Sequence, residues 1–154
     1  MSDAQDLIES LALQPHPEGG FYRETYRAEL TVNTPMGLRP VGTSIFYLLS
    51  GKDVSRFHRI DADEIWFHHR GGPLIIYSLD ADGSIRSERL TTSHPQILIK
   101  AGVWFGAALE QPDDYCLVGC TVMPGFEFAG FELADSDQLL AGWPDAEDWI
   151  ERLT

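Results

Sequence analysis

Positive charge is scarce in this sequence. Its 154 residues include 11 Lys and Arg against 24 Asp and Glu, a formal net charge of -13 at pH 7 with neutral His. Such a chain repels the phosphates of nucleic acids and the headgroups of an anionic bilayer, and no cluster of Lys or Arg offsets this repulsion locally. We therefore expect neither a nucleic-acid partner nor a membrane-surface partner.

Long apolar runs and a secretion signal are also missing. No stretch is long or apolar enough to span a bilayer, and the opening MSDAQDLIES lacks a basic region followed by an apolar run. These absences predict a cytoplasmic location. The chain also lacks internal repeats, linkers and low-complexity tracts, so we expect one domain that spans residues 1–154.

Cysteine is rare as well. The two cysteines, Cys116 and Cys120, lie four residues apart in CLVGC. On a strand they would share one side but lie roughly 13 Å apart, which is too far for a disulfide bond. We expect both to be buried free thiols.

What the chain does contain is a series of short segments with a period of two. Gly, Pro and Asp-Gly separate these segments, a pattern typical of a sandwich, jelly roll or barrel. Asp82 and Gly83 predict a hairpin with a type I′ turn. The predicted strands include FYRETYRAE, GTSIFYLLS, DEIWFHH, PLIIYSLDADG, QILIKAG and YCLVGCTVMPGF.

Helical spacing appears at the two ends of the chain. Ser2 and Gln5 fit a capping box for a helix that should end before Pro15, with Leu7, Ile8 and Leu11 on one face. Near the other end, Pro144 suits the first turn of a helix that contains Trp149, Ile150 and Leu153. This helix is expected to pack outside the β core.

Potential metal ligands gather in one apolar stretch, FHRIDADEIWFHH, from Phe57 to His69. If Glu64 faces the interior, alternation places Trp66 and His68 on the same side and His69 on the opposite side. Polar groups in such a buried strand need hydrogen-bond partners or a ligand, so the stretch predicts a ligand-facing row.

The spacing of His58, Glu64 and Gly71 resembles the first motif of the cupin superfamily. IKAGVWFGAAL resembles the second motif, with Lys100 at the usual proline position. Ile60 and Phe105 stand where the resemblance would place two further histidines.

Longer segments resemble the cupin-5 branch, a family of small proteins of unknown function. They are PHPEGGFYRET, SIFYLL, FHRIDADEIWFHHRGGPL, AGVWFGA and GCTVMPGFEFAGFEL. The resemblance implies an all-β double-stranded β-helix, the cupin jelly-roll barrel, here with short flanking N- and C-terminal helices. It also implies a homodimer and a small-molecule pocket at the barrel mouth, but no particular activity.

A cupin metal site ordinarily gathers three imidazoles and one carboxylate. This chain keeps one of each, so we expect no cofactor; a divalent metal, if one binds, would use His58 and Glu64. Alternation directs His69 to the opposite face from Glu64. His68 is no substitute, because four residues of strand separate it from Glu64 by roughly 13 Å.

A proton-transfer role is the alternative that the resemblance offers. Some cupins, such as dTDP-4-dehydrorhamnose 3,5-epimerase, use a histidine oriented by a carboxylate and no metal. By that resemblance, His58 would be the base and Glu64 its partner, in an isomerase or epimerase that acts on a sugar-like or nucleotide-sugar metabolite. The general acid stays open among Tyr22, Tyr26, Tyr47 and Tyr115.

Other interpretations remain open at this point. His58 and Glu64 could form a structural pair, the protein could bind a metabolite without turnover, or it could be a metal-dependent enzyme with a reduced ligand set. A stoichiometric metal would favour the last of these.

Further substrate-binding candidates lie on several strands. Glu18 and Arg23 are predicted to bind polar ligand groups, since an arginine fork suits carboxylate or phosphate. Alternation places Tyr22, Glu24 and Tyr26 on one side of their strand, opposite Arg23. The remaining substrate-binding candidates are Trp66, His68 and Phe105. Phe105 would either form an apolar wall of the pocket or fill the barrel. We expect the phenylalanines of PGFEFAGFEL to pack along the barrel or form a dimer contact; they are Phe126, Phe128 and Phe131.

Overall fold

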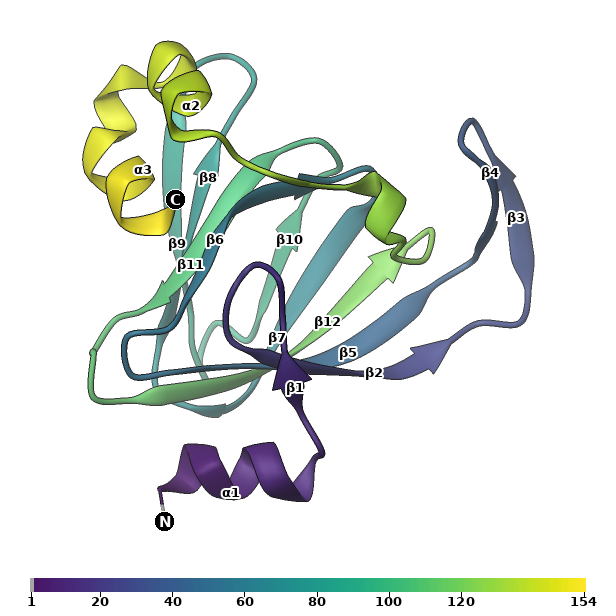
Figure 1. The fold of residues 1–154 in the computed structure, drawn as a ribbon, viewed down its shortest axis with the longest axis horizontal. Coiled ribbons are helices and arrows are strands. Elements are labelled where there is room, and N and C mark those ends of the chain that lie inside the picture. The colour runs from purple at the N-terminus through teal and green to yellow at the C-terminus, as the bar shows by residue number, and fades with distance from the viewer. Residues whose placement is uncertain (1) are drawn as a thin grey trace.

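Two antiparallel sheets build the barrel in the computed structural model, which describes residues 2–154 (Figure 1). The first sheet has the strand order β1 (Gln14–Pro15), β2 (Phe21–Arg27), β5 (Thr43–Ser50), β12 (Tyr115–Met123), β7 (Asp63–Gly71) and β10 (Gln96–Ile99). The second has the order β13 (Phe131–Leu133), β6 (Val54–Ile60), β11 (Trp104–Leu109), β8 (Leu74–Leu79) and β9 (Ile85–Leu90). The predicted all-β jelly-roll architecture is confirmed.

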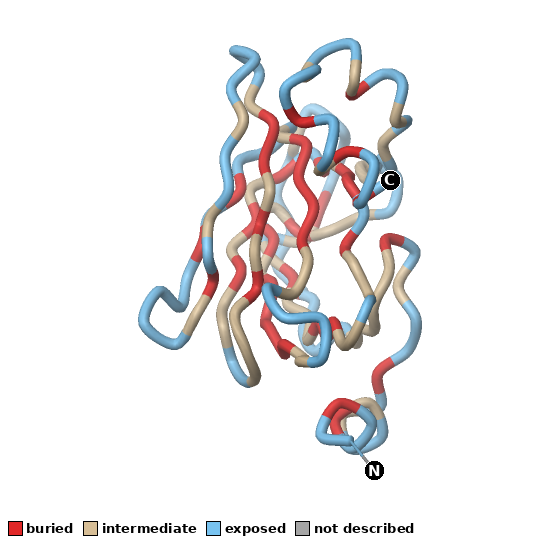
Figure 2. The backbone as a smooth tube through the Cα atoms, turned by 90° about the vertical axis from the view of Figure 1, so that its left-hand side faces the viewer, coloured by how far each residue is buried: buried red, intermediate tan, exposed pale blue. Residues whose placement is uncertain are grey.

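The main core lies between the two sheets. Tyr47 and Trp66 reach it from the first sheet, and Leu74, Ile76 and Phe105 reach it from the second. Along β7, Glu64 and Trp66 are buried whereas Ile65 and Phe67 are half-buried, as the period of two predicts. Figure 2 shows that buried residues follow the strands while the projecting loops are exposed.

Helix α1 (Asp3–Ser10) begins at Ser2, whose side chain accepts a hydrogen bond from the backbone N of Gln5 at 3.2 Å. The helix ends before Pro15, as predicted. Ala4 and Leu7 pack against Leu48 and Leu117 of the first sheet.

The helical segments near the other end of the chain cover the second sheet. They are α2 (Ser136–Gly142), the 3-10 turn η2 (Pro144–Ala146) and α3 (Glu147–Leu153). Ile150 and Leu153 pack with Phe57, Leu79 and Trp104 outside the barrel interior, as predicted. No helix in the described part of the chain is both long and apolar enough to cross a bilayer.

The predicted hairpin joins β8 to β9, but its turn differs from the prediction. The backbone N of Gly83 donates to the carbonyl of Asp80 at 3.0 Å, and the N of Asp80 donates to the carbonyl of Ser84 at 2.9 Å. Gly83 alone within this loop has a positive φ, +89°. The loop is therefore a three-residue connection with a left-handed glycine, and the predicted type I′ turn is wrong.

A separate hairpin of β3 (Thr31–Thr34) and β4 (Gly37–Pro40) extends away from the barrel (Figure 1). Its large apolar side chains are exposed, with Leu30, Met36 and Leu38 each about 70% accessible. Cys116 and Cys120, by contrast, are buried free thiols in β12, as predicted.

Candidate functional site

A tight turn at residues 16–20 brings Glu18 to the wall of the barrel. The backbone N of Gly19 donates to the carbonyl of His16 at 3.0 Å, and the turn docks on β6, where the N of Arg56 donates to the carbonyl of Glu18 at 2.8 Å. Gly19 has a φ of +111°, and a Cβ there would collide with the carbonyl of Val54. Glycine is thus required for both the backbone angle and the close approach.

Glu18 and His58 form a buried pair. Oε2 of Glu18 lies 3.0 Å from Nε2 of His58, while Oε1 accepts from the hydroxyl of Ser55 at 3.0 Å. The other ring nitrogen of His58, Nδ1, lies 2.7 Å from the carbonyl oxygen of Arg56. Since both nitrogens face oxygen acceptors, the pair favours an imidazolium beside a carboxylate.

The electrostatics of the pair agree with this assignment. Burial is the largest single influence and alone would lower the pKa of His58. The charge and hydrogen bond of Glu18, with smaller contributions from Glu64 and the backbone of Arg56, together outweigh burial, so the pKa is raised. Burial opposes ionisation of Glu18 too, yet the charge and hydrogen bond of His58, with help from His16 and Ser55, lower its pKa. His58 is therefore a stabilised cation whose nitrogens are both engaged.

His16 is held in the opposite state. Its Nδ1 accepts a hydrogen bond from the backbone N of Glu18 at 3.1 Å, which places the ring hydrogen on Nε2. Burial lowers the pKa of His16, and the nearby His58 adds to that effect against the pull of Glu18. The result is a neutral imidazole whose Nε2 hydrogen bonds to no other described residue.

Glu64 is a buried carboxyl without a hydrogen-bond partner of standard geometry among the described residues. Burial, followed by repulsion from Glu18, raises its pKa to about 7. The charge of His58 and hydrogen bonding from Trp66 and Cys120 oppose this rise. Trp66 Nε1 lies near enough to influence the carboxyl although it makes no hydrogen bond of standard geometry in the described part.

These groups line a cavity of about 110 Å³ at one end of the barrel. Its deep wall carries Glu18, His58 and Glu64, and its other walls are mainly aromatic and aliphatic. The lining residues are His16, Glu18, Tyr22, Glu24, Arg27, Thr43, Ile45, His58, Ile60, Glu64, Cys120, Val122, Phe126, Phe128 and Phe131.

A β-bulge decides which side chains of β2 reach the cavity. The pairing of β2 with β5 shifts between Glu24 and Tyr26, so Thr25 is the extra residue. Beyond this bulge the sides exchange, so Arg27 lines the cavity and Tyr26 does not. Strict alternation had predicted Tyr26 on the side of Tyr22 and Glu24.

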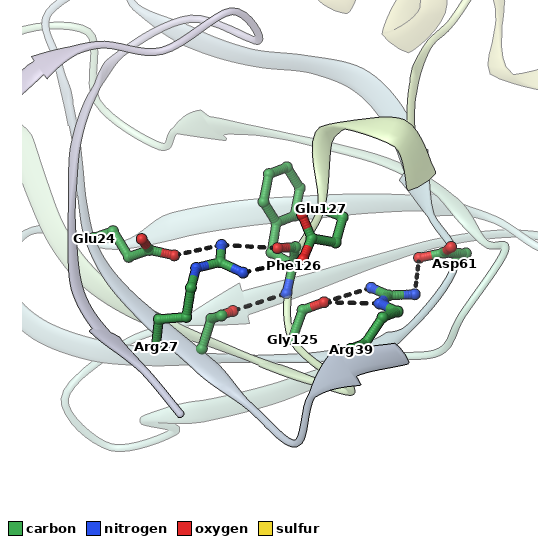
Figure 3. Close-up of polar contacts among 8 residues, drawn as sticks. Glu24, Arg27, Arg39, Asp61, Gly125, Phe126 and Glu127 are labelled. Carbon is green, nitrogen blue, oxygen red and sulfur yellow. Dashed lines mark hydrogen bonds and ion pairs between the residues drawn. The ribbon is translucent and has the colours of Figure 1, made fainter. Parts of the chain in front are cut away.

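The rim of the cavity is a segment that we call the strap, residues 124–131, which contains the 3-10 turn η1 (Phe128–Gly130). Arg27 donates to Glu24 at 2.7 Å, to Glu127 at 3.2 Å and to the carbonyl of Phe126 at 2.9 Å (Figure 3). This arginine therefore ties β2 to the strap.

Arg39 and Thr43 hold the strap from the other side. The buried guanidinium of Arg39 donates to the carbonyl of Gly125 at 3.0 Å and to Asp61 at 2.8 Å (Figure 3). The backbone N of Phe126 donates to the hydroxyl of Thr43 at 2.9 Å. The strap is thereby fixed with its aromatic rings against the cavity.

The structure brings five of the nine predicted site residues together at the cavity. Glu18, Tyr22, Glu24, His58 and Glu64 line it. The predicted pairing of His58 with Glu64 is corrected, since Glu18 is the carboxylate that hydrogen-bonds the imidazole.

Four predicted site residues lie elsewhere. Arg23 is on the side of β2 that faces away from the cavity. Trp66 and Phe105 are 1% and 0% exposed in the barrel core. His68 lies beside the carbonyl groups of Gly71 and Gly72. Phe105 fills the barrel and packs against His58 with the two rings tilted by 52° and their centroids 4.3 Å apart.

Of the tyrosines left open as the acid, Tyr22 lines the cavity. Tyr47 donates its hydroxyl to the carbonyl of Gly19 at 2.6 Å. The sequence did not predict His16 and Arg27 as cavity residues. His16 precedes a Gly-Gly turn that docks on a strand distant in sequence, which local patterns do not reveal. Arg27 is redirected by a bulge that contains no glycine, so no residue type indicates it.

The donor set does not fit a resident metal ion. Within residues 2–154, no three His, Cys, Asp or Glu side chains gather in an arrangement suited to one. His58 already uses both nitrogens, and the apolar Ile60 and Phe105 occupy positions where the cupin resemblance would place further imidazoles.

Taken together, the strand order and the cavity between the sheets define a cupin barrel. Residues 5–134 match the family described as Cupin superfamily (DUF985), Cupin_5, and the chain belongs to this family. The predicted branch of the superfamily is thus confirmed.

Two solved structures resemble this chain over nearly its whole length. Protein SO0799 of Shewanella oneidensis is 40% identical, with a TM-score of 0.91 over 100% of this chain and 98% of that one. A hypothetical protein from Leishmania major is 30% identical, with a TM-score of 0.89 over 99% of both chains.

Two further comparisons are more distant. An uncharacterized protein of Saccharomyces cerevisiae, YML079W, is 29% identical over 82% of this chain and 73% of its own length. Oxalate decarboxylase from Lactobacillus farciminis shares 17% identity and a TM-score of 0.60 over 92% of this chain and 41% of its own, which shows a common fold alone.

Proposed function

We propose that this protein binds a small, ring-shaped, sugar-like metabolite in the cavity and moves a proton on it, as a metal-independent isomerase or epimerase. The observation that carries the proposal is Glu64, a carboxyl in the cavity wall that is 8% exposed and has no hydrogen-bond partner of standard geometry among the described residues. A pKa of about 7 suits a group that must both take and return a proton near neutral pH.

The proton transfer uses Glu64 as the base. Its carboxylate takes a proton from a carbon next to a carbonyl group; the C–H bond breaks and the electron pair moves onto the carbonyl oxygen. In an α-hydroxycarbonyl compound, the hydroxyl on the deprotonated carbon then passes its proton to the former carbonyl oxygen and becomes the new carbonyl group. Glu64 returns the first proton to the former carbonyl carbon, which completes an isomerisation. Return to the opposite face of the first carbon, by a second group such as Tyr22, completes an epimerisation.

Two histidines support the developing negative charge. His16 offers an Nε2 hydrogen that bonds to no other described residue, and the His58 imidazolium lies beside Glu64 in the same wall. Donors and positive charge placed before the reaction begins stabilise an oxyanion with little reorganisation. His58 thus takes an electrostatic role in place of the predicted role as base.

Exchange of hydrogen with solvent tests the proposal. The protein is incubated in D₂O with a panel of aldoses and ketoses, and deuterium uptake at carbon is followed by NMR. Wild type and Glu151→Gln are expected to catalyse exchange, whereas Glu64→Gln is not; Glu151 is exposed on α3 and lies outside the cavity. Equal exchange by Glu64→Gln would contradict the role of Glu64.

Binding without turnover is the second candidate function. It is favoured by His58, whose two nitrogens are already hydrogen-bonded and which is therefore a poor proton acceptor. A ligand that binds the wild type while the full panel shows no exchange would support this candidate.

We also propose that the protein forms a homodimer and is located in the cytoplasm. The exposed apolar side chains of the β3–β4 hairpin, among them Met36 and Leu38, support a second copy as their cover. Light scattering of the purified protein measures the mass directly.

A further inference from the structure

Apart from Glu64, the charged groups that line the cavity belong to two ion-paired sets. In the deep wall, Glu18 is paired with His58 at 3.0 Å. At the rim, Arg27 lies between Glu24 and Glu127, at 2.7 and 3.2 Å, and also donates to the carbonyl of Phe126. The one arginine of the lining therefore has its donors directed at protein oxygens.

Glu64 is left as the unpaired acidic group of the lining. It is more than nine-tenths buried, and the hydrogen bonds that Trp66 and Cys120 direct at its carboxyl group lack standard geometry. A largely buried carboxylate with weak hydrogen bonds is costly, and because Glu64 lines the cavity, a ligand that donates a hydrogen bond to it recovers part of that cost.

Aromatic rings form much of the remaining wall. The rings of Phe126 and Phe128 meet edge to face at 4.9 Å, and those of His16 and Tyr22 at 4.5 Å. The faces of Phe and Tyr rings carry partial negative charge, so they stack on flat rings and attract cations.

From these three observations we infer that the cavity selects a flat or ring-shaped compound that is neutral or cationic and presents an amine, amidine or similar N–H donor to Glu64. A phosphorylated or carboxylated compound would have to displace Glu24 or Glu127 from Arg27 and then lie beside the freed carboxylates. The chain's net charge of -13 adds to that repulsion.

The inferred ligand preference narrows the substrate class of the proposed function, and it rests on this cavity being the site of that function. Nucleotide sugars, which carry a diphosphate, are thereby excluded in favour of neutral or amino-substituted rings.

Three probes of nearly equal size test the charge preference: benzamidine, benzamide and benzoate, which are a cation, a neutral amide and an anion. Binding to the full chain is measured by calorimetry at pH 8, where Glu64, with a pKa of about 7, is mostly ionised. We expect benzamidine to bind at least about tenfold more tightly than benzoate, with benzamide between them.

Two variants test whether Glu64 causes the preference for the cationic probe. Glu64→Gln is expected to weaken benzamidine by about tenfold or more and to leave benzamide nearly unchanged. The control Glu151→Gln, on the outer helix α3, should bind all three probes as the wild type does.

Three results would overturn the inference: benzoate binding as tightly as benzamidine, no binding by any probe at its solubility limit, or full benzamidine affinity in Glu64→Gln. None of the probes can be isomerised. The binding order therefore holds or fails separately from the deuterium exchange that tests the proposed function.

Discussion

Nε2 of His58 lies 3.0 Å from Oε2 of Glu18, and the two side chains are 2% and 8% exposed. This pair joins the Gly-Gly turn before β2 to the strand β6. Removing one member of a buried pair leaves the other charge without compensation, which costs more than the pair itself contributes. The contact between His58 and Glu18 therefore supports both the stability of the fold and the shape of the cavity.

Glu18→Gln is expected to lower the free energy of unfolding by about 3 kcal/mol. Without the Glu18 carboxylate, burial of His58 is less opposed, so its pKa should fall. Urea unfolding at pH 6 and NMR titration of the imidazole measure the two effects. The control Glu132→Gln removes the half-exposed ion pair with Arg59 and should cost no more than about 1 kcal/mol.

The pH dependence of this pair follows from the direction of each pKa shift. The raised pKa of His58 stabilises the fold below its ordinary value of 6.5, an effect lost as pH rises through the folded pKa. The lowered pKa of Glu18 stabilises the fold above 4.5, an effect lost as pH falls. Glu18→Gln should therefore differ most from wild type between these values, and a constant difference from pH 4 to 9 would contradict the pair.

Glu64→Gln is expected to stabilise the protein at high pH. The folded pKa of about 7 exceeds the ordinary value of 4.5, so stability from the neutral carboxyl is present below 4.5 and is lost as pH rises through 7. The amide stays neutral, so the variant should gain about 3 kcal/mol over wild type at pH 8 and under about 1 kcal/mol at pH 5. Urea unfolding at both values checks this, and Glu151→Gln should show no such dependence.

Gly19→Ala should damage the cavity more than Gly83→Ala. Both glycines have a positive φ, +111° and +89°, so both variants strain the backbone. A Cβ at Gly83 meets open space, whereas one at Gly19 collides with Val54. We expect a loss of about 1–2 kcal/mol for Gly83→Ala and a larger loss, with weaker benzamidine binding, for Gly19→Ala. Equal losses would show that the docked turn tolerates the extra carbon.

The two arginines that hold the strap should differ in how much each contributes to the free energy of unfolding. Arg39 is buried and paired with Asp61 and Gly125, so Arg39→Met is expected to cost about 2–4 kcal/mol. Arg27 is half-exposed, and Arg27→Met should cost no more than about 1 kcal/mol. Hydrogen exchange of residues 124–131 should rise in both variants; an unchanged rate in Arg39→Met would contradict its anchoring role.

The barrel could be predicted from the sequence because its determinants are local. Alternation along β7 correctly placed Glu64 and Trp66 inside, and Ser2 marked the start of α1. Local pattern also located the hairpin at Gly83 but not its turn type, since the three-residue loop and the type I′ turn use the same Asp-Gly signal.

The partner of His58 could not be predicted in this way. Glu64 is near in sequence, whereas Glu18 arrives through a turn whose docking on β6 depends on backbone contacts with Arg56 and Val54. The bulge at Thr25 likewise exchanges Tyr26 for Arg27 on the cavity side, and pairing with β5 creates it rather than any residue type. Both misses are consequences of tertiary contacts that override a period of two.

Anchoring and recognition are separated along the strap. Its supports attach mainly to the main chain: Arg39 to the carbonyl of Gly125, Arg27 to the carbonyl of Phe126, and Thr43 to the amide of Phe126. The rings of Phe126 and Phe128, which face the ligand space, take no part in those polar contacts. Exchanging these rings would retune selectivity while the rim keeps its place, so this loop is where a library built to change the ligand of this barrel should begin.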